Sequence, residues 1–171
     1  MRQGLPEIGT LWIGSELPKI EWLCLTSMVA NGHHVTLYTY DDIHAPKGVV
    51  VADASVIIPK NKIFTYKNTG SYATFADWFR LRMIAQTGKV WLDADAALLK
   101  PFNPTEDYFF VGGKHKSFGI SVNNYAIMDP SESAFIEDAL SYFDQPAKFL
   151  RYMAWYRSAR LMLNRAITGR W

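Results

Sequence analysis

The sequence predicts an α/β fold in which a mixed, mostly parallel sheet is flanked by helices. Strand-like and helix-like segments alternate along the chain, which is the pattern of layered α/β proteins. Of the 171 residues, 49% are apolar, enough for one substantial core. In mid-chain an apolar strand-like run ends in an acidic pair, and ligands of open α/β sheets collect at such strand ends. We therefore expect a ligand site at the carboxyl edge of the sheet.

The N-terminal part of the chain predicts a strand–helix–strand unit. Leu11–Ile13 is a short apolar run ending at Gly14, which indicates a buried strand. Pro18 suits a first helical turn, and residues with helical spacing follow until Gly32 can stop the helix. The β-rich stretch 34–40 then predicts the second strand. The residues with helical spacing in the expected helix after Pro18 are Ile20, Leu23, Cys24, Ser27 and Met28.

The middle of the chain predicts a third strand, a loop, a long helix and a fourth strand. Residues 54–58 form an apolar run stopped by Pro59, and the polar stretch 60–70 predicts a loop. The helix ends at Gly88, and the strand 89–92 leads directly into Asp93. The apolar residues of the helix that ends at Gly88 are Phe75, Trp78, Phe79, Leu81, Met83 and Ile84.

The last third predicts a strand pair, a helix and a basic tail. Strands are expected at 108–111 and 120–128, with a loop at 112–118 between them, and a helix at 131–143. We divide the chain into a main α/β unit, 1–147, and a C-terminal helix, 148–171. Within 148–171 six residues are basic and none is acidic, and Tyr and Trp side chains are interleaved. This segment fits a packed terminal helix with solvated arginines, or an interfacial helix resting on anionic lipid.

The acidic pair Asp93 and Asp95 predicts a site for Mg²⁺ or Mn²⁺. Successive strand side chains alternate between faces, so the two carboxylates are expected to project the same way. Both cations prefer oxygen ligands, and one or two protein carboxylates suffice when substrate phosphates and water complete the shell. The alternative is that two acidic residues simply mark the turn after a strand.

Charge and cysteine content narrow the expected partners. A net charge of +2 is too small to predict a nucleic-acid-binding protein. Cys24 is the only cysteine, so no internal disulfide can form, which suits a reducing compartment. No secretory leader and no uninterrupted apolar stretch of membrane-spanning length is evident. We expect a cytoplasmic protein, with peripheral contact at the inner face of the membrane if 148–171 binds lipid.

Four segments in fixed order resemble the glycosyltransferases with a DXD sugar-binding motif, the family that includes α-1,4-glycosyltransferases and capsular polysaccharide enzymes. They are Leu11-Trp12-Ile13-Gly14, Ala76-Asp77-Trp78-Phe79-Arg80, Gly88, and Trp91-Leu92-Asp93-Ala94-Asp95. The resemblance implies a GT-A-like nucleotide-diphospho-sugar transferase fold. The family's catalytic domain ordinarily continues past this length, so the resemblance also predicts a C-terminally short member.

The resemblance assigns donor-binding residues. It implies that Trp12 stacks on the nucleotide base, with Ile13 and Gly14 beside the donor, although a tryptophan on a central strand is as commonly a core residue. Asp77 and Arg80 share one helix face and would contact the donor, whereas an ordinary surface pair of this kind is worth about 0.2–0.5 kcal/mol. Asn124, or its neighbour Asn123, resembles a family asparagine near the sugar.

The resemblance also implies the reaction. Asp95 would bind the metal directly, and Asp93 would reach it through water or hold donor hydroxyls. The expected activity is transfer of a hexose from a nucleotide sugar, UDP-linked, to a saccharide or glycolipid acceptor with retention, in surface polysaccharide or glycolipid synthesis. Two other functions stay open: a non-catalytic module that binds a sugar nucleotide or glycan, and a phosphatase with an aspartate nucleophile. For Trp91 the sequence alone indicates burial in the core.

Overall fold

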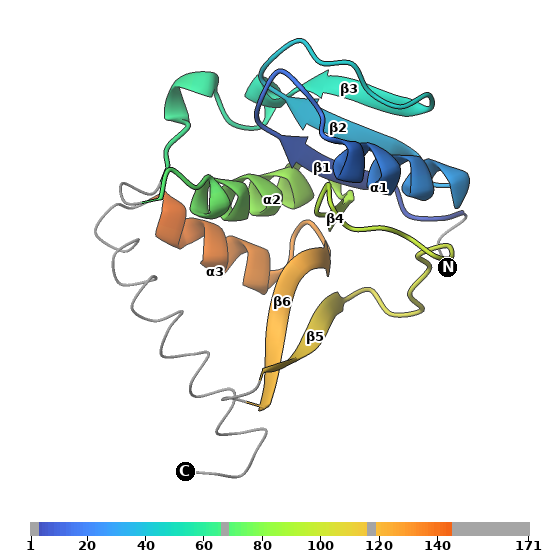
Figure 1. Cartoon of the computed structure of the whole chain (residues 1–171). Coiled ribbons are helices and arrows are strands. Elements are labelled where there is room, and N and C mark those ends of the chain that lie inside the picture. Colours follow the sequence, from blue (N-terminus) through green and yellow to red (C-terminus); the bar gives the residue numbers. More distant parts are fainter. Residues whose placement is uncertain (1–3, 66–68, 116–118, 145–171) are drawn as a thin grey trace.

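The computed structural model describes residues 4–65, 69–115 and 119–144. These residues form a six-stranded mixed sheet and three α-helices, which confirms the predicted α/β class (Figure 1). The strand order across the sheet is β3-β2-β1-β4-β6-β5. The elements are β1 (Ile8–Trp12), α1 (Lys19–Ala30), β2 (Val35–Thr39), β3 (Val49–Asp53), α2 (Ala73–Thr87), β4 (Val90–Leu92), β5 (Phe109–His115), β6 (Gly119–Met128) and α3 (Ala134–Phe143), with 3₁₀ turns at Ala54–Val56 and Lys60–Lys62.

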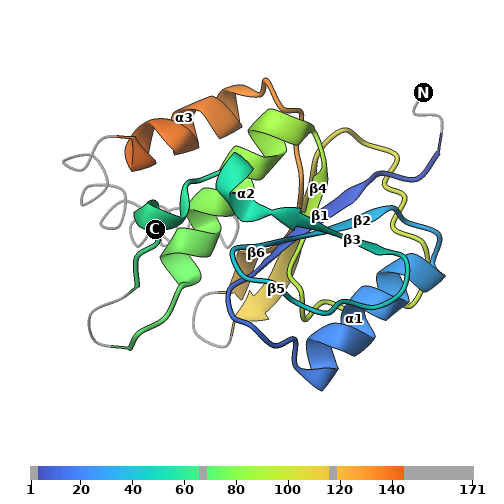
Figure 2. The same ribbon diagram turned by 90° about the horizontal axis from the view of Figure 1, so that it is seen from above.

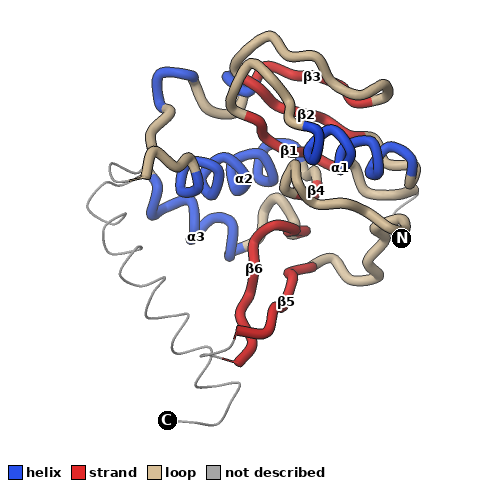
Figure 3. Tube along the Cα trace, viewed as in Figure 1, coloured by secondary structure: helices blue, strands red, loops and turns tan. Residues whose placement is uncertain are grey.

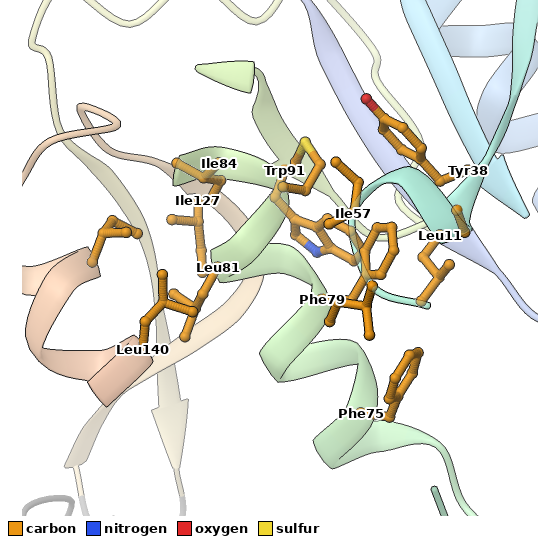
Figure 4. Close-up of a cluster of buried hydrophobic side chains, with 14 of the residues drawn as sticks. Leu11, Tyr38, Ile57, Phe75, Phe79, Leu81, Ile84, Trp91, Ile127 and Leu140 are labelled. Carbon is orange, nitrogen blue, oxygen red and sulfur yellow. The ribbon is translucent and has the colours of Figure 1, made fainter. Parts of the chain in front are cut away.

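The helices cover both faces of the sheet. Seen from above, α1 lies on one side of the strands and α2 with α3 on the other (Figure 2). Two buried clusters fill these layers. The α1 side includes Ile8, Leu25, Met28, Leu37 and Leu92. The α2–α3 side includes Leu11, Phe75, Phe79, Trp91, Ile127 and Leu140 (Figure 4).

The predicted strand–helix–strand unit is confirmed. β1 and β2 are parallel neighbours, with Ile8 opposite Val35 and Trp12 opposite Thr39, and α1 connects them. β4 pairs parallel to β1 on its other side, whereas β6 runs antiparallel to β4. The chain thus builds β1, β2 and β3 outward in one direction and returns to place β4 on the opposite side of β1. This reversal makes the carboxyl ends of β1 and β4 the topological switch point of the sheet.

The prediction of a strand at 54–58 is wrong. The edge strand β3 lies just upstream and pairs parallel to β2, and Ala54–Val56 forms a 3₁₀ turn. The Asp53 carboxylate accepts a 2.8 Å hydrogen bond from the Ser55 N–H, which turns the chain away from the sheet. Ala54, Ile57 and Ile58 are apolar because they cover the α2 side of the core. Conversely, Val50 in the strand is 62% exposed, so its apolar side chain does not indicate burial.

The helix that begins after Pro18 is confirmed, but its buried face differs from the expected one. Cys24, Leu25 and Met28 are buried, whereas Ile20 and Leu23 are 67% and 66% exposed. Apolar residues occur on more than one face of α1, so their positions do not identify the buried face. Only the residues that pack against the sheet lose contact with water.

Two glycines allow α2 to end and to pack closely. Gly88 adopts a left-handed conformation, φ 64°, and its N–H donates to Ile84 O at 2.9 Å, which confirms the predicted helix stop. On β1, a Cβ at Gly9 would lie 2.6 Å from the sulfur of Met83 on α2. The helix consequently sits directly against the strand, with no room for a side chain between them.

The last two strands form a long hairpin that extends past the rest of the sheet (Figure 3). The loop expected at 112–118 is wrong for 112–115, which belong to β5; residues 116–118 lie outside the described part. Pairing jumps from Phe110 opposite Ile127 to Val111 opposite Asn123, so 124–126 form a bulge on β6. Bulges redirect side chains locally, which matters for Asn124 below.

The predicted C-terminal unit 148–171 lies outside the described residues. No described helix combines the length and the apolarity needed to cross a membrane.

Candidate functional site

Several of the predicted site residues meet at the switch point between β1 and β4. Asp93 follows β4 directly, and its N–H donates to Tyr125 O on β6 at 2.7 Å. Asp77 and Arg80 lie in the first half of α2, which packs on β1 and β4. Asn124 arrives from the bulge of β6. Two consecutive elements, α2 and β4, and the more distant β6 thus deliver charged and amide side chains to one edge of the sheet.

Asp93 is held by a hydrogen bond and an ion pair that share a single oxygen. The Trp91 indole N–H donates to Asp93 Oδ1 at 2.6 Å, and Arg80 Nη1 lies 3.6 Å from the same atom. The side chain of Asp93 is 31% exposed, so it is partly shielded from water without being enclosed. Its second oxygen has no hydrogen-bond or ion-pair partner in the described part of the chain and remains available to a ligand.

Asp77 is held in the same way. Asn124 Nδ2 donates to Asp77 Oδ1 at 2.7 Å, and Arg80 Nη2 lies 3.3 Å from that oxygen. The Asp77 side chain is 34% exposed, and its other oxygen has no partner among the described residues. Asn124 reaches α2 from the bulged part of β6, so the irregular pairing of the hairpin contributes directly to the site.

Arg80 joins these groups from beneath. It is only 6% exposed, and its guanidinium carbon lies 4.9 Å from the centre of the Trp91 ring. Its Nε donates to Ala76 O at 3.3 Å, and Nη1 donates to the main-chain oxygen of Asn124. The structure therefore places Arg80 behind the two carboxylates, with its donors directed at protein groups. A stacked, forked cation of this kind holds several acceptors in fixed geometry, which lysine cannot do.

Burial and charge act in opposite directions on the two carboxyls. Loss of solvation raises the pKa of Asp93, and Arg80 and the Trp91 hydrogen bond offset part of that rise. Burial likewise raises the pKa of Asp77, against the lowering effects of Arg80 and then Asn124. The charge of Asp93 also raises the pKa of Asp77, and the charge of Asp95 raises the pKa of Asp93. A second cation would relieve this repulsion, and titratable groups perturbed in this way are typical of functional sites.

Asp95 lies outside the regular strand. β4 ends at Leu92, and the Ala96 N–H donates to Asp93 O at 2.9 Å, so the chain turns at Asp93–Ala96. The argument from strand alternation is therefore wrong for Asp95, which sits on an exposed turn. Its charge still reaches Asp93, because it is one of the causes that raise that pKa.

Carboxylate oxygens are the ligands expected for a divalent cation that shares its shell with phosphate and water. The described residues contain no cluster of three or more His, Cys, Asp or Glu side chains able to hold a metal ion. They do offer the unengaged oxygen of Asp93 and the exposed carboxylate of Asp95. One or two carboxylates with substrate phosphates are the usual protein contribution to a Mg²⁺ site, so these two residues would hold such an ion.

The remaining predicted residues lie at the end of β1. Trp12 is half-buried against the α1-side cluster, and its indole N–H donates to Glu16 O at 2.8 Å. Ile13 packs on the opposite, α2-side cluster. Gly14 has φ 141°, a backbone conformation that side chains rarely adopt. The hydrogen bond of Trp12 holds its ring at the strand end, and base stacking there stays a prediction.

Trp91 is the site residue that sequence reasoning missed. Its burial in the core is confirmed at 2% exposure, but the indole also contacts Asp93 and Arg80. A signal was present, since residues two apart on a strand share a face, and the N–H of Trp91 could therefore reach the carboxylate of Asp93. Buried indoles usually find such a partner.

No family model matches this chain. Comparisons with curated proteins and with solved structures likewise give no match. The geometry of the site and the resemblance in its motifs therefore carry the functional argument.

Proposed function

We propose that this chain is a GT-A-like glycosyltransferase domain that moves a hexose from a nucleotide sugar, UDP-linked, to a saccharide or glycolipid acceptor with retention. The observation that carries the proposal is the arrangement of Asp77, Arg80, Asp93 and Asn124 at the β1–β4 switch point. It agrees with the resemblance of the sequence motifs to DXD glycosyltransferases, which assigned these residues to the donor.

The residues have separate tasks in this reaction. The free oxygens of Asp77 and Asp93 accept hydrogen bonds from donor hydroxyls, a task for which ionised carboxylates are suited. Arg80 lowers the pKa of both carboxyls, against the effect of burial, and pairs with them from behind. Asp95 and Asp93 would hold Mn²⁺ or Mg²⁺, which stabilises the charge that develops on the departing diphosphate. Trp12 would stack on the base at the end of β1.

Donor turnover by the purified chain tests the proposal. UDP release is measured with a panel of UDP-sugars and saccharide acceptors, with Mn²⁺ and with a chelator. The expected result is metal-dependent release that falls roughly 100-fold in Asp95→Ala, since metal stabilisation is worth several kcal/mol and each 1.36 kcal/mol is about tenfold. Glu132→Ala is the matched control, because this exposed acid follows β6 at the opposite edge of the sheet.

Each other outcome points to a different function. Donor binding without UDP release identifies a sugar-nucleotide binding module. A phosphoenzyme on Asp93 with release of inorganic phosphate identifies a phosphatase. Unchanged metal-dependent turnover in Asp95→Ala overturns the assignment of that residue to the metal.

A further inference from the structure

Trp91 lies where the core of the protein meets the candidate site. It is the central residue of β4 and is 2% exposed, and its ring packs among the buried side chains of the α2–α3 side (Figure 4). The Phe79 ring of α2 is 6.4 Å away, centre to centre. The indole is therefore fixed by the core on one side, and its nitrogen is free to act on the other.

Two contacts connect this fixed ring to the site. Its N–H donates to Asp93 Oδ1 at 2.6 Å, and its face lies 4.9 Å from the guanidinium carbon of Arg80. Arg80 Nη1 is in turn 3.6 Å from Asp93 Oδ1. The three residues form a closed set in which each contacts the other two.

The closed set constrains the carboxylate more than either contact could alone. A carboxylate held by one hydrogen bond can still swing about that bond, and an ion pair between the same oxygen and a cation restricts the swing. The Trp91 hydrogen bond and the Arg80 ion pair both act on Oδ1, which leaves the other oxygen of Asp93 without a partner among the described residues. Hydrogen bonds that orient a metal-binding carboxylate in this way commonly change metal affinity or activity 10- to 100-fold when removed.

We propose that Trp91 is a positioning residue that orients Asp93, so that one carboxylate oxygen stays directed toward a cation–diphosphate ligand. The inference rests on the proposed function for the identity of the ligand. The orientation itself is a property of the free protein and can be measured without any ligand.

The first measurement tests the contact. The chain has six tryptophans, so ¹⁵N-tryptophan labelling gives a small set of indole N–H signals. The Trp91 signal is expected to exchange slowly with solvent and to shift in Asp93→Ala, a variant that leaves Trp91 in place. An unshifted Trp91 signal in Asp93→Ala shows that the hydrogen bond does not form and overturns the inference.

The second measurement tests the consequence. Mn²⁺ is titrated in the presence of UDP into the wild type and into Trp91→Phe, which keeps an aromatic ring beneath Arg80 and removes the N–H. The apparent dissociation constant for Mn²⁺ is expected to rise 10- to 100-fold. Trp78→Phe is the matched control, because Trp78 is a half-buried tryptophan of α2 whose N–H has no hydrogen-bond partner in the described part of the chain.

The outcomes separate this inference from the proposed function. Tight Mn²⁺–UDP binding by both the wild type and Trp91→Phe overturns the positioning role and leaves the glycosyltransferase proposal standing. Equal weakening in Trp78→Phe and Trp91→Phe shows a general packing effect and also overturns it. Failure of the wild type to bind Mn²⁺ with UDP overturns the proposed function and the role of Trp91 toward that ligand together.

Discussion

Asn124 Nδ2 and Asp77 Oδ1 are joined by a 2.7 Å hydrogen bond although they lie 47 positions apart in the chain. The bond connects the bulge of β6 to α2, and it holds one of the two carboxylates of the candidate site. Arg80 Nη2 approaches the same oxygen at 3.3 Å, so Asp77 combines a hydrogen bond from a neutral amide with an ion pair. The integrity of the site therefore depends on how the hairpin is placed against the helix.

Asn124→Ala is expected to lower the free energy of unfolding by about 1.5 kcal/mol, because it removes a hydrogen bond to a carboxylate. The main-chain oxygen of Asn124 still accepts from Arg80, so the variant isolates the amide. Urea unfolding at neutral pH measures the change. Asn123→Ala is the control on the same strand, and a loss there as large as at Asn124 would contradict the assigned contact.

Arg80→Met is expected to destabilise the protein by about 3 kcal/mol at pH 7, since it leaves two partly buried carboxylates without their cation. Burial raises and Arg80 lowers the pKa of both Asp77 and Asp93, so both values rise further in the variant. Carboxyls with a raised pKa favour folding below their unfolded pKa of about 3.9 and lose that contribution as the pH rises. The deficit should therefore be largest at neutral pH and shrink in acid.

Arg82→Met provides the comparison for Arg80 on the same helix. Arg82 pairs with Asp144, but the two side chains are 32% and 46% exposed. Exposed pairs contribute about 0–1 kcal/mol, so this variant should show a small and nearly pH-independent change. Equal losses at the two arginines, measured by urea unfolding between pH 4 and pH 7, would rule out the buried role of Arg80.

His33→Ala is expected to loosen the segment that carries Asp95. His33 is 4% exposed; its Nδ1 lies 2.9 Å from Pro6 O, and its Nε2 accepts from the Phe102 N–H at 3.0 Å. Removing both contacts should cost about 2 kcal/mol. Hydrogen exchange should accelerate most at the Phe102 amide, whereas the Leu98 amide keeps its 2.9 Å bond to Ser27 Oγ.

His34→Ala is the control for His33, because the neighbouring ring is exposed. It should leave the exchange of the Phe102 amide unchanged. Faster exchange in both variants would show that the turn between α1 and β2, and not the hydrogen bond from Phe102, holds the segment.

Asp129→Asn is expected to raise the free energy of unfolding at pH 7 by about 1 kcal/mol. Asp129 is 5% exposed, and burial raises the pKa of its carboxyl, with a smaller opposing effect from Ser133. Because the raised pKa disfavours the charged form, the wild type should gain stability as the pH falls toward about 4. Thermal unfolding measured from pH 7 to pH 4 should show that the extra stability of the variant over the wild type disappears in acid. A stability difference that grew in acid would contradict the prediction.

The order of most elements could be predicted from local patterns, and the exceptions share one physical cause. The helix stop at Gly88 and the strand before Asp93 follow from backbone preferences of neighbouring residues. The misplaced third strand and the exposed Ile20 both lie where apolar residues do not indicate a buried strand or helix face. Burial depends on which layer covers a segment, and local composition does not contain that information.

For the candidate site too, local contacts could be predicted from the sequence and the turn after β4 could not. Asp77 and Arg80 lie three residues apart on α2, so their common face follows from the sequence. Trp91 lies on β4 and Asp93 directly follows that strand, so the two-residue alternation still places them on one face. The chain turns at Asp93–Ala96, so the alternation of side chains along a strand does not extend to Asp95.

The sequence by itself determined the strand–helix order, the motif residues and the local faces on which they lie, because these depend on backbone geometry over a few residues. Only the tertiary structure decided that the β6 bulge brings Asn124 to Asp77 and that Arg80 lies buried behind two carboxylates. Those relationships depend on how distant elements pack, since hydrogen bonds and loss of solvation are set by neighbours in space.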